Sequence, residues 1–598
     1  MQTPFCRESA KAFKLGTALE KTVIYSNIWY MSAENPYSAK NERISSEEMK
    51  KEIISTVFPE QLKSPEELEQ IYPHRELPEG AMVTRIAPSP TGFMHIGHLY
   101  TGLISERFAH QTGGVFYLRF EDTDKKREVE GSKELAIKSL NDFGIINDEG
   151  LDVNGVESGK YAPYTQSERM EIYHSYVKKL LENDNAYLCF CTIEDLEQMR
   201  AEQDESKVPP GYYSEWAKWR NKGDDEVLEA LRDGREFVVR FKSPGNLGNR
   251  IAVEDRILGS RDLPENNQDV VIMKADGLPT YHLAHVVDDH LMRTTTVIRG
   301  DEWLSSLPLH LQLFDTFGWE RPEYAHIAPI QKLEGTSRRK LSKRKDPEAN
   351  VAYFKEQGYL KEAILEYLLN LANSNFEDWR KSNSTKNYRE FPLSFEKLKS
   401  STGALFDFDK LNDISKELIS KFTADEVYIS VVAWAKENDT SLATLLESDP
   451  AYAKKIFSIE RTLDEKSRKD LKKWSDVREE IEYFFDDNFA FSESELIENI
   501  NSISAAEIKE IVQEFITSYS VTDSKDVWFE KIKQIAGNRG FATSTSEFKK
   551  NPASFKGSVS EMVKIFRVLL TGRAQTPDLH AVMQAMGEER VFRRLSLI

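Results

Sequence analysis

The sequence has few cysteines and no long apolar run, and each absence excludes a class of protein. Only three of the 598 residues are cysteine, at positions 6, 189 and 191. Three thiols cannot form a disulfide scaffold and suit a reducing compartment, so we expect a cytoplasmic protein. No stretch of about 18 consecutive apolar residues occurs, so we expect no membrane partner. The first thirty residues also lack the apolar centre of a secretory signal.

Basic residues are fewer than acidic residues over the whole chain. Lys and Arg number 80 against 99 Asp and Glu, and the net charge is −19. Such a balance argues against nonspecific nucleic-acid binding, because phosphates attract basic surfaces. One basic run nevertheless occurs at 338–345 (RRKLSKRK), where six of eight residues are cationic. A run of this kind is usually a solvated surface, but it also gives an acidic protein a local site for phosphates or RNA.

An α/β pattern begins at Val83. A short apolar strand there is followed by a stretch with helical periodicity. Gly113 and Gly114 end this helix, and the apolar run Val115–Phe120 is typical of a buried parallel strand. The apolar face of the helix consists of Ile96, Leu99, Leu103, Ile104 and Phe108. Strand, helix and strand in succession form a βαβ unit, which predicts a doubly wound sheet.

The remaining elements follow from the same periodicities. Strands are expected at 237–241, 270–274, 296–299 and 325–330, and helices at 168–181, 192–202, 281–290 and 360–369. An amphipathic stretch from Met49 to Val57 belongs to an extension with little core of its own. The last helix is expected to have Thr576 as its N-cap, Pro577 in its first turn and Gly587 at its end.

Length and pattern together predict several domains, because 598 residues exceed one hydrophobic core. The expected fold is a Rossmann-like, doubly wound parallel sheet with an inserted α+β domain and all-helical C-terminal domains. The expected segments are a partly disordered N-terminal extension (1–80), the first half of the α/β domain (81–162), the insertion (163–275), the second half with the basic run (276–350) and two helical domains (351–430 and 431–598).

The residues after the first strand carry the first candidate chemistry. They lie at the carboxyl end of that strand and lead into a helix, where ligands bind in open α/β sheets. A helix N-terminus offers free N–H groups and partial positive charge to phosphates. Gly97 permits close backbone approach, while His95 and His98 add two donors on one turn. Taken alone, two such histidines would more often pack or face solvent.

Two motifs change that balance. His95–His98 spells HIGH, and Lys340–Arg344 (KLSKR) is similar to KMSKS. In this order the pair is typical of class I aminoacyl-tRNA synthetases, and the chain resembles that class. The resemblance implies ATP as substrate, accompanied by Mg²⁺, and a mobile cationic loop that stabilises the leaving pyrophosphate. The implied catalytic residues are His95, His98 and Lys343, and the implied ATP-binding residues are His95, Gly97, His98, Lys340, Ser342 and Lys343.

Four further stretches resemble the glutamyl-tRNA synthetases in particular. They are 85–92 (RIAPSPTG), 119–124 (RFEDTD), 281–290 (YHLAHVVDDH) and 297–303 (VIRGDEW), and the similarity extends from residue 82 to the C-terminus. Glutaminyl enzymes share much of this pattern. The glutamate pocket that the resemblance implies consists of Arg85, Ala87, Ser89, Glu121, Tyr281, His285, Arg299 and Trp303, with Glu302 at the acceptor end of tRNA. Within these stretches Arg119 and Asp122 fit salt-bridge partners better than ligands, and Trp303 has a plain core role as its alternative.

The chemistry of glutamate agrees with these residues. Glutamate has two carboxylates and one ammonium, and Arg85 and Arg299 are each expected at the end of a strand, where a guanidinium can bind a carboxylate through two hydrogen bonds. Glu121 can pair with the ammonium. Position 285 departs from the family, since many bacterial relatives have asparagine there. An imidazole at 285 can also donate to a carboxylate.

The resemblance implies a two-step reaction. The α-carboxylate of glutamate attacks the α-phosphorus of ATP, and the terminal ribose hydroxyl of tRNA then attacks the glutamyl adenylate. The insertion would bind the acceptor end, and the helical domains would contact the stem and the anticodon, as in bacterial-type enzymes. The expected partners are L-glutamate and tRNA(Glu), and a non-discriminating enzyme would also charge tRNA(Gln). We expect a monomer.

Cys189 and Cys191 are candidate ligands for a zinc site. Some relatives bind zinc in the acceptor domain through a Cys-x-Cys pair, a tyrosine and a third cysteine. Cys189 and Cys191 supply the pair, and Tyr212 or Tyr213 follows, but the only other cysteine is Cys6. Structural zinc sites have four ligands, so zinc is not expected here.

Overall fold

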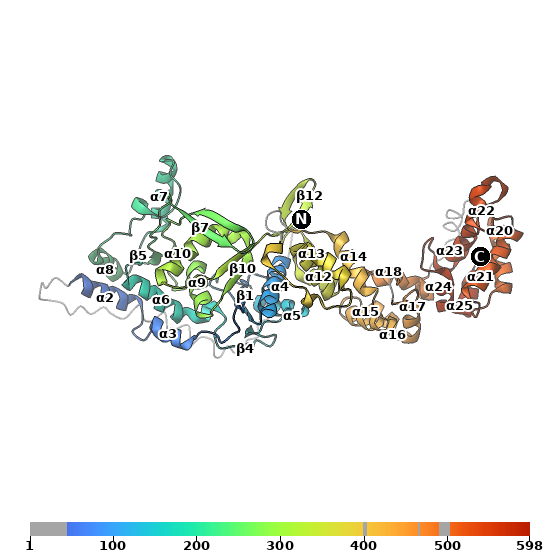
Figure 1. Cartoon of the computed structure of the whole chain (residues 1–598), viewed down its shortest axis with the longest axis horizontal. Helices are drawn as coiled ribbons and strands as arrows, with labels where there is room; N and C mark the ends of the chain where they lie inside the picture. Colours follow the sequence, from blue (N-terminus) through green and yellow to red (C-terminus); the bar gives the residue numbers. More distant parts are fainter. Residues whose placement is uncertain (1–44, 399–403, 464–466, 490–502, 598) are drawn as a thin grey trace, which may run out of the picture.

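The computed structural model describes residues 45–398, 404–463, 467–489 and 503–597. The expectation of a partly disordered extension falls mainly on residues 1–44, which lie outside the described residues. The molecule is elongated, with the strands in one half and a long series of helices in the other (Figure 1). No described helix combines the length and apolarity needed to cross a membrane.

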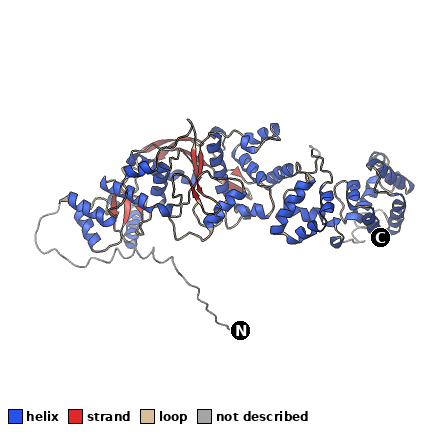
Figure 2. Ribbon diagram, turned by 90° about the horizontal axis from the view of Figure 1, so that it is seen from below, coloured by secondary structure: helices blue, strands red, loops and turns tan. Residues whose placement is uncertain are grey.

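A parallel sheet forms the centre of the α/β half. Strand β1 (Val83–Ile86) pairs with β2 (Val115–Leu118), and β10 (Thr296–Gly300) pairs with β11 (Glu323–Ile327), both in parallel. Thr295 N, next to β10, donates to Val83 O at 3.0 Å, so β1 and β10 lie side by side. Helices surround these strands (Figure 2). They include α4 (Ile96–Gln111), α5 (Ser132–Asp142), α9 (Tyr281–Leu291) and α10 (Leu307–Phe317). The predicted doubly wound fold is confirmed.

Helix α4 forms where its sequence predicted. All five residues of its expected apolar face are buried. Gly114, just after the helix, is required by space, since a Cβ there would lie 1.9 Å from Met82 O. The close approach of the two backbones allows the chain to turn directly from α4 into β2. The C-terminal end of the helix in this βαβ unit therefore depends on glycine.

The segment 163–275 contains a separate antiparallel sheet and also extends the central one. Strand β6 (Val238–Phe241) pairs with β5 (Ala186–Cys189) and β9 (Val271–Met273). The hairpin of β7 (Arg250–Asp255) and β8 (Gly259–Pro264) instead joins β11, through Asp255 and Tyr324. The helices of this segment are α6 (Met170–Glu182), α7 (Ile193–Glu205) and α8 (Asp224–Arg232). A short hairpin of β3 (Gly150–Leu151) and β4 (Glu157–Ser158) precedes them.

The expected strand at 325–330 is wrong in its bounds. The structure has β11 ending at Ile327 and a new strand, β12 (Ile330–Glu334), beginning three residues later. Pro329 lies between them and has no N–H to donate, so one continuous strand is disfavoured. The basic run is also not one loop, because its first part is β13 (Ser337–Lys340), which pairs antiparallel with β12.

The described part of the N-terminal extension packs onto the protein. Helix α2 (Ser46–Val57) contains the expected amphipathic stretch and begins with a capping box between Ser45 and Glu48. It is followed by α3 (Pro65–Ile71). The buried side chains of this segment, Ile53, Phe58, Leu68 and Tyr72, join the core around α6 and α9. The extension thus has no separate core, as expected, but it shares a large one.

The C-terminal part of the described chain is almost entirely helical. Its helices are α11 (Val351–Glu356), α12 (Lys361–Ala372), α13 (Asn375–Ser382), α14 (Phe408–Ile419), α15 (Ala424–Asn438), α16 (Thr440–Ser448), α17 (Pro450–Phe457), α18 (Val477–Ile481), α20 (Ala505–Ser518), α21 (Lys525–Asn538), α22 (Thr545–Lys550), α23 (Val559–Thr571), α24 (Leu579–Met586) and α25 (Glu588–Leu595). The two-residue strand β14 (Ala404–Leu405) pairs with β12.

The expected N-cap of the helix that ends at Gly587 is wrong. Asp578, not Thr576, is the N-cap of α24, and its carboxylate accepts from Ala581 N at 3.0 Å. An ionised carboxylate is a strong cap at the positive end of a helix, and Pro577 then precedes the cap instead of occupying the first turn. Gly587 ends the helix as expected.

Candidate active site

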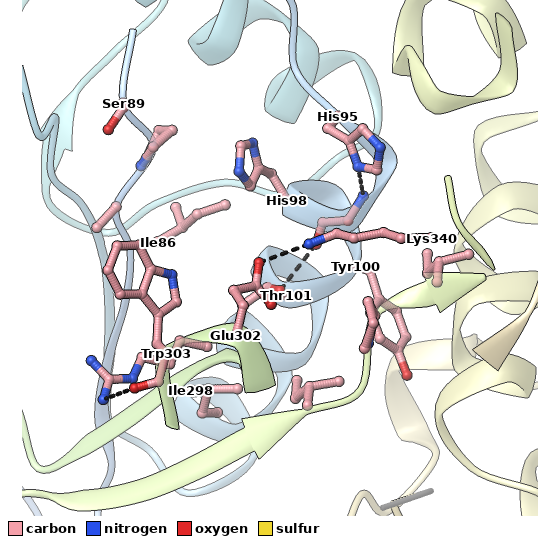
Figure 3. Close-up of a pocket in the computed structure, with 18 of the residues that line it drawn as sticks. Ile86, Ser89, His95, His98, Tyr100, Thr101, Ile298, Glu302, Trp303 and Lys340 are labelled. Carbon is pink, nitrogen blue, oxygen red and sulfur yellow. Dashed lines mark hydrogen bonds and ion pairs between the residues drawn. The ribbon is translucent and has the colours of Figure 1, made fainter. Parts of the chain in front are cut away.

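A cavity of about 440 Å³ opens at the carboxyl ends of β1 and β10. It lies where the chain leaves two adjacent parallel strands in opposite directions, the usual ligand site of open α/β sheets. Figure 3 shows side chains from β1, β10, α4 and β13 converging on it. The predicted site residues that line it are Arg85, Ala87, Ser89, His95, Gly97, His98, Glu121, Tyr281, Arg299, Glu302, Trp303, Lys340 and Lys343.

The N-terminus of α4 forms one end of the cavity. His95 is the N-cap of this helix, and its Nδ1 accepts from Gly97 N at 2.9 Å. This bond leaves the proton of a neutral ring on Nε2, which is then a hydrogen-bond donor. A Cβ at position 97 would lie 3.1 Å from His95 Nδ1, so glycine gives this cap its room.

Both histidines of the motif are held neutral at pH 7. Burial lowers the pKa of His95 below its ordinary value. His98 reaches solvent through the cavity, yet protein surrounds much of its ring; this partial desolvation and the charge of Lys343 lower the pKa of His98 to about 4. Each ring is therefore a neutral hydrogen-bond donor and not a fixed cation.

The two lysines of the basic run approach this end from the β12–β13 hairpin. Lys340 Nζ donates to Glu302 Oε1 at 2.9 Å, as drawn in Figure 3. Lys343 Nζ donates to Phe93 O at 3.0 Å and lies 4.9 Å from the centre of the Phe93 ring. The Lys340 side chain is 53% exposed and Lys343 is also exposed, so both ammonium groups remain within reach of an incoming phosphate.

The rest of the basic run stabilises the loop itself. Arg339 donates two hydrogen bonds to Asp346, at 2.6 and 2.8 Å. Asp346 also accepts from Ser342 N at 2.8 Å. The hydrogen bonds from Arg339 hold the pKa of Asp346 well below its usual range. These bonds turn Ser342 toward Asp346, and this predicted ATP-binding residue does not line the cavity.

Buried arginines form the opposite end of the cavity. Arg85 Nε lies 3.3 Å from Asp289 Oδ1, and Arg119 donates to the same oxygen at 2.7 Å. Burial alone would raise the pKa of Asp289, but Arg85 and Arg119 hold it well below its usual range. Arg119 also donates to Glu121 Oε1 at 3.0 Å, so this glutamate is oriented from behind the cavity wall.

Arg299 differs from its neighbours because its described contacts are all neutral groups. Its Nε donates to His326 Nε2 at 3.1 Å, and its NH1 lies 3.2 Å from His310 Nδ1. NH1 also donates to Tyr281 Oη at 3.3 Å and NH2 to Trp303 O at 3.4 Å. None of the described carboxylates lies within ion-pair distance of this guanidinium. A buried cation of this kind favours an anionic ligand.

Comparison with known proteins agrees with these features. A family model described as "tRNA synthetases class I (E and Q), catalytic domain" matches residues 81–413. A second model, "Anticodon binding domain", matches residues 442–598. This chain belongs to the class I tRNA synthetases for glutamate and glutamine. The cavity described above lies entirely within the part of this synthetase that the catalytic-domain model matches.

Individual relatives cover nearly the whole synthetase. The "Glutamate--tRNA ligase" of Clostridium perfringens (strain 13 / Type A) is 48% identical over 543 residues, which is 91% of this chain and 99% of the relative. That of Acetivibrio thermocellus is 45% identical over 91% of this chain and 99% of the relative. A crystal structure of a glutamate tRNA ligase from Elizabethkingia meningosepticum has 29% identity and a TM-score of 0.69, over 86% of this chain and 98% of that one.

The synthetase places one expected glutamate-binding residue outside the cavity wall. His285 is fully buried, with its ring stacked against Tyr281 at 5.5 Å and its Nδ1 2.9 Å from Asp289 Oδ2. Burial lowers the pKa of His285 to about 3, so the ring is neutral. Tyr281 stacks on it, and His285 does not line the cavity. The expectation that His285 binds glutamate therefore stays a prediction, with the ring placed behind the cavity wall.

The structure also shows residues that the sequence interpretation missed. Asp289 holds Arg85 and Arg119, and it stands at the end of the 281–290 motif, so the doubled aspartate there was an available signal. His310 and His326 contact Arg299 but belong to no recognised motif.

The alternatives that the sequence offered for three residues can be compared with the structure. Arg119 and Asp122 are both ion-paired, Asp122 with Lys125 and Lys133. Trp303 lines the cavity with 37% of its surface exposed, so it is not a core residue.

The cysteine pair faces only one of the two candidate tyrosines. The Sγ atoms of Cys189 and Cys191 each lie 3.4 Å from Tyr212 Oη, while Tyr213 donates to Pro209 O. Two thiols and one phenol make three donors, one fewer than a structural zinc site uses. Within the described part of the chain, no group of three or more His, Cys, Asp or Glu side chains is arranged to hold a metal ion.

Proposed function

We propose that this synthetase ligates L-glutamate to tRNA(Glu), with ATP, through a glutamyl-adenylate intermediate. The observation that carries the proposal is the buried cation Arg299 beside Arg85 at one end of a cavity whose other end has the HIGH histidines and two lysines. The name carried by the clostridial relatives, glutamate–tRNA ligase, supports the same substrate. The 48% identity extends over nearly the whole chain, and the family motifs supply many of the residues that line the cavity.

The arginine end supports an acidic amino acid. Arg85 and Arg299 offer two guanidinium groups for the two carboxylates of glutamate. By similarity to the family, Arg85 takes the side-chain carboxylate, and Glu121 pairs with the ammonium. Ala87 and Ser89 are small enough to leave room beside them. Glutamine, with a neutral side-chain amide, would give Arg85 no second carboxylate and would lose a charge-assisted pair that glutamate can make.

The other end supports binding of the ATP phosphates. The N–H groups at the start of α4 and the neutral donors His95 and His98 face the place where phosphate oxygens would lie. Lys340 and Lys343 would stabilise the negative charge that develops on the leaving pyrophosphate. Magnesium, carried by the phosphates, would shield their charge from the attacking carboxylate. Ser342 would contribute through its place in the loop, not by direct contact.

Positioning is the main source of catalysis in this scheme. The α-carboxylate held at the arginine end attacks the α-phosphorus held at the α4 end, and pyrophosphate leaves. The terminal ribose hydroxyl of tRNA then attacks the glutamyl carbonyl, and AMP leaves. No side-chain nucleophile is needed. His95, His98 and Lys343 are the proposed catalytic residues, because they line the phosphate end of the cavity and would contact the reacting phosphates.

The domain roles are proposed on the same family basis. Residues 163–275 would bind the acceptor end, which would meet Glu302 at the mouth of the cavity. Residues 351–430 would contact the stem, and 431–598 the anticodon. We propose a monomeric enzyme that works in the cytoplasm, where glutamate, ATP and tRNA are all supplied.

The test is ATP-dependent charging of labelled glutamate onto purified transcripts of tRNA(Glu) and tRNA(Gln). Charging of tRNA(Glu) alone is the expected result. Charging of both would identify a non-discriminating enzyme whose Glu-tRNA(Gln) must be amidated by another enzyme. If neither is charged with glutamate and labelled glutamine is accepted instead, the proposal is wrong.

A further inference from the structure

A buried carboxylate and a buried histidine stand directly behind Arg299. Asp255, His326 and Arg299 are 4%, 0% and 5% exposed, so solvent contributes little to any of them. His326 lies opposite Arg299 in the parallel register of β10 and β11, which places the two side chains on one face of the sheet. Asp255 is the last residue of β7, and it pairs with Tyr324 of β11. Three neighbouring strands thus bring the three groups together.

The hydrogen bonds give this chain of residues a direction. Asp255 Oδ2 lies 2.6 Å from His326 Nδ1, and His326 Nε2 accepts from Arg299 Nε at 3.1 Å. An arginine only donates, so Nε2 must be the unprotonated nitrogen of the ring. The proton is therefore on Nδ1, where it donates to Asp255. The carboxylate selects this tautomer, as second partners of functional histidines do elsewhere.

The carboxylate itself is held rigidly. Asp255 Oδ1 accepts from Ile257 N at 2.9 Å and from Leu258 N at 2.8 Å. The N–H of His326 also donates to Asp255 Oδ2, at 3.1 Å. Hydrogen bonds from His326 and from these backbone groups lower the pKa of Asp255 against the effect of burial. Burial lowers the pKa of His326, so its ring stays neutral beside Arg299.

A second imidazole supports the same arrangement. His310 Nδ1 lies 3.2 Å from Arg299 NH1, and His310 Nε2 lies 3.0 Å from His282 Nδ1. Arg299 therefore meets two neutral rings through their lone pairs. Neutral acceptors orient a guanidinium without cancelling its charge, whereas a carboxylate in direct contact would compete with the substrate.

We propose that Asp255 and His326 are positioning residues for glutamate: through the Nδ1–H tautomer of His326 they orient Arg299 to bind a substrate carboxylate while leaving it a full cation. This inference rests on the proposed function, since it takes glutamate as the ligand of Arg299. It also gives the segment 163–275 a part in amino-acid binding, because Asp255 belongs to that segment. The segment would then serve two of the three substrates, tRNA and glutamate.

Two substitutions of His326 separate positioning from packing. In His326→Gln the side-chain oxygen can take the place of Nε2 and accept from Arg299. In His326→Asn the shorter amide reaches Asp255 but leaves Arg299 Nε without an acceptor. Both remove the same ring from the same buried place, so their losses of stability should be similar. Only their effects on Arg299 differ.

The measurement is glutamate-dependent exchange between ATP and pyrophosphate, with tRNA present. We expect His326→Asn to raise the KM for glutamate by about 10-fold to 100-fold, the usual loss for a hydrogen bond to a charged group. His326→Gln should recover most of this loss. The KM for ATP should stay unchanged in both. Equal KM values for glutamate in the two variants, or equal rises for glutamate and ATP, would overturn the inference.

Asp255→Asn tests the carboxylate. Its oxygen can keep the bonds from Ile257 N and Leu258 N, and its NH₂ group then faces His326 Nδ1 and favours the opposite tautomer. We expect the KM for glutamate to rise as in His326→Asn. Asp148→Asn is the matched control, because Asp148 also pairs with a histidine, His110, and accepts from a backbone N–H, yet this pair has no contact with Arg299. It should leave the KM for glutamate unchanged.

Failure of the proposed function would look different from failure of this inference. If the unmodified enzyme charges no tRNA with glutamate, the proposed function falls, whatever His326 does. The tautomer can then still be read from the ¹⁵N shifts of labelled histidine in the whole protein. A proton on Nδ1 of His326 that moves to Nε2 in Asp255→Asn is the expected result. A proton on Nε2 in the unmodified protein would overturn the inference.

Discussion

The two ends of the cavity hold their charged groups in opposite ways. At the arginine end, Arg85 and Arg299 are buried, and carboxylates or imidazoles fix them from behind. At the phosphate end, Lys340 and Lys343 are exposed, and each has a single hydrogen bond to the protein among its described contacts. A rigid buried site suits selection of one amino acid. Exposed lysines on a hairpin suit a group that must follow a leaving phosphate.

The largest effect is expected from breaking the rigid end. Asp289→Asn removes the negative charge with which both Arg85 and Arg119 pair. Two buried guanidinium groups then lose this counter-charge. Loss of one partner of a buried ion pair costs about 3–5 kcal/mol, so we expect a loss of stability of this size. Scanning calorimetry measures it, since a chain of several domains unfolds in more than one step.

The control for this variant is an ion pair on the surface. Asp315 pairs with Arg321 with both side chains at least 40% exposed. Asp315→Asn should cost less than about 1 kcal/mol, as exposed pairs do. Equal losses in the two variants would mean that burial does not distinguish the arginine end.

The next largest effect is expected at the phosphate end, on rate and not on stability. Lys343→Ala should lower kcat for pyrophosphate exchange by about 10²-fold to 10³-fold, the usual loss when a group that stabilises developing charge is removed. The thermal transition should not move, because the side chain is exposed. Lys345→Ala, in the same loop but outside the cavity lining, should change neither quantity. A large loss of stability in Lys343→Ala would contradict the contrast between the two ends.

The smallest effect concerns pH and the buried histidine behind Tyr281. The folded protein holds the pKa of His285 at about 3, because the ring is buried. The unfolded chain has a pKa near 6.5, so it binds the proton more readily, and stability is lost as the pH falls below about 6.5. His285→Asn should remove about 2 kcal/mol of the loss between pH 7 and pH 5.

His110 is the control for the pH experiment, because its shift has the opposite sign. Hydrogen bonds with Asp148 and Glu106 raise the pKa of His110 to about 9. Its contribution to stability is complete below about pH 6.5 and is lost as the pH rises toward 9. His110→Asn should therefore change the dependence between pH 5 and pH 7 by less than about 1 kcal/mol, and in the opposite direction to His285→Asn. Calorimetry at the two pH values checks both variants.

Sequence periodicity predicted helices well where burial of one face is the main requirement. The face of α4 and the amphipathic α2 were confirmed because helical periodicity reports burial directly. The strand expected at 325–330 and the cap expected at Thr576 were wrong, since Pro329 and Asp578 exert a stronger local effect than apolar content. The family motifs likewise predicted most of the cavity lining. They did not predict that His285 and Ser342 lie outside the cavity lining.

The sequence by itself determined the fold class, the family and the groups that offer chemistry to a substrate. Those properties depend on residue type and on short spacings along the chain, which a sequence displays directly. Only the tertiary structure decided what stands behind those groups. His310 and His326 contact Arg299, and Asp255 acts on it through His326, because β7, β10, β11 and α10 come together in space. Asp289 reaches Arg85 because α9 packs near β1. Long-range pairing of strands and helices sets these contacts, and no local spacing records it.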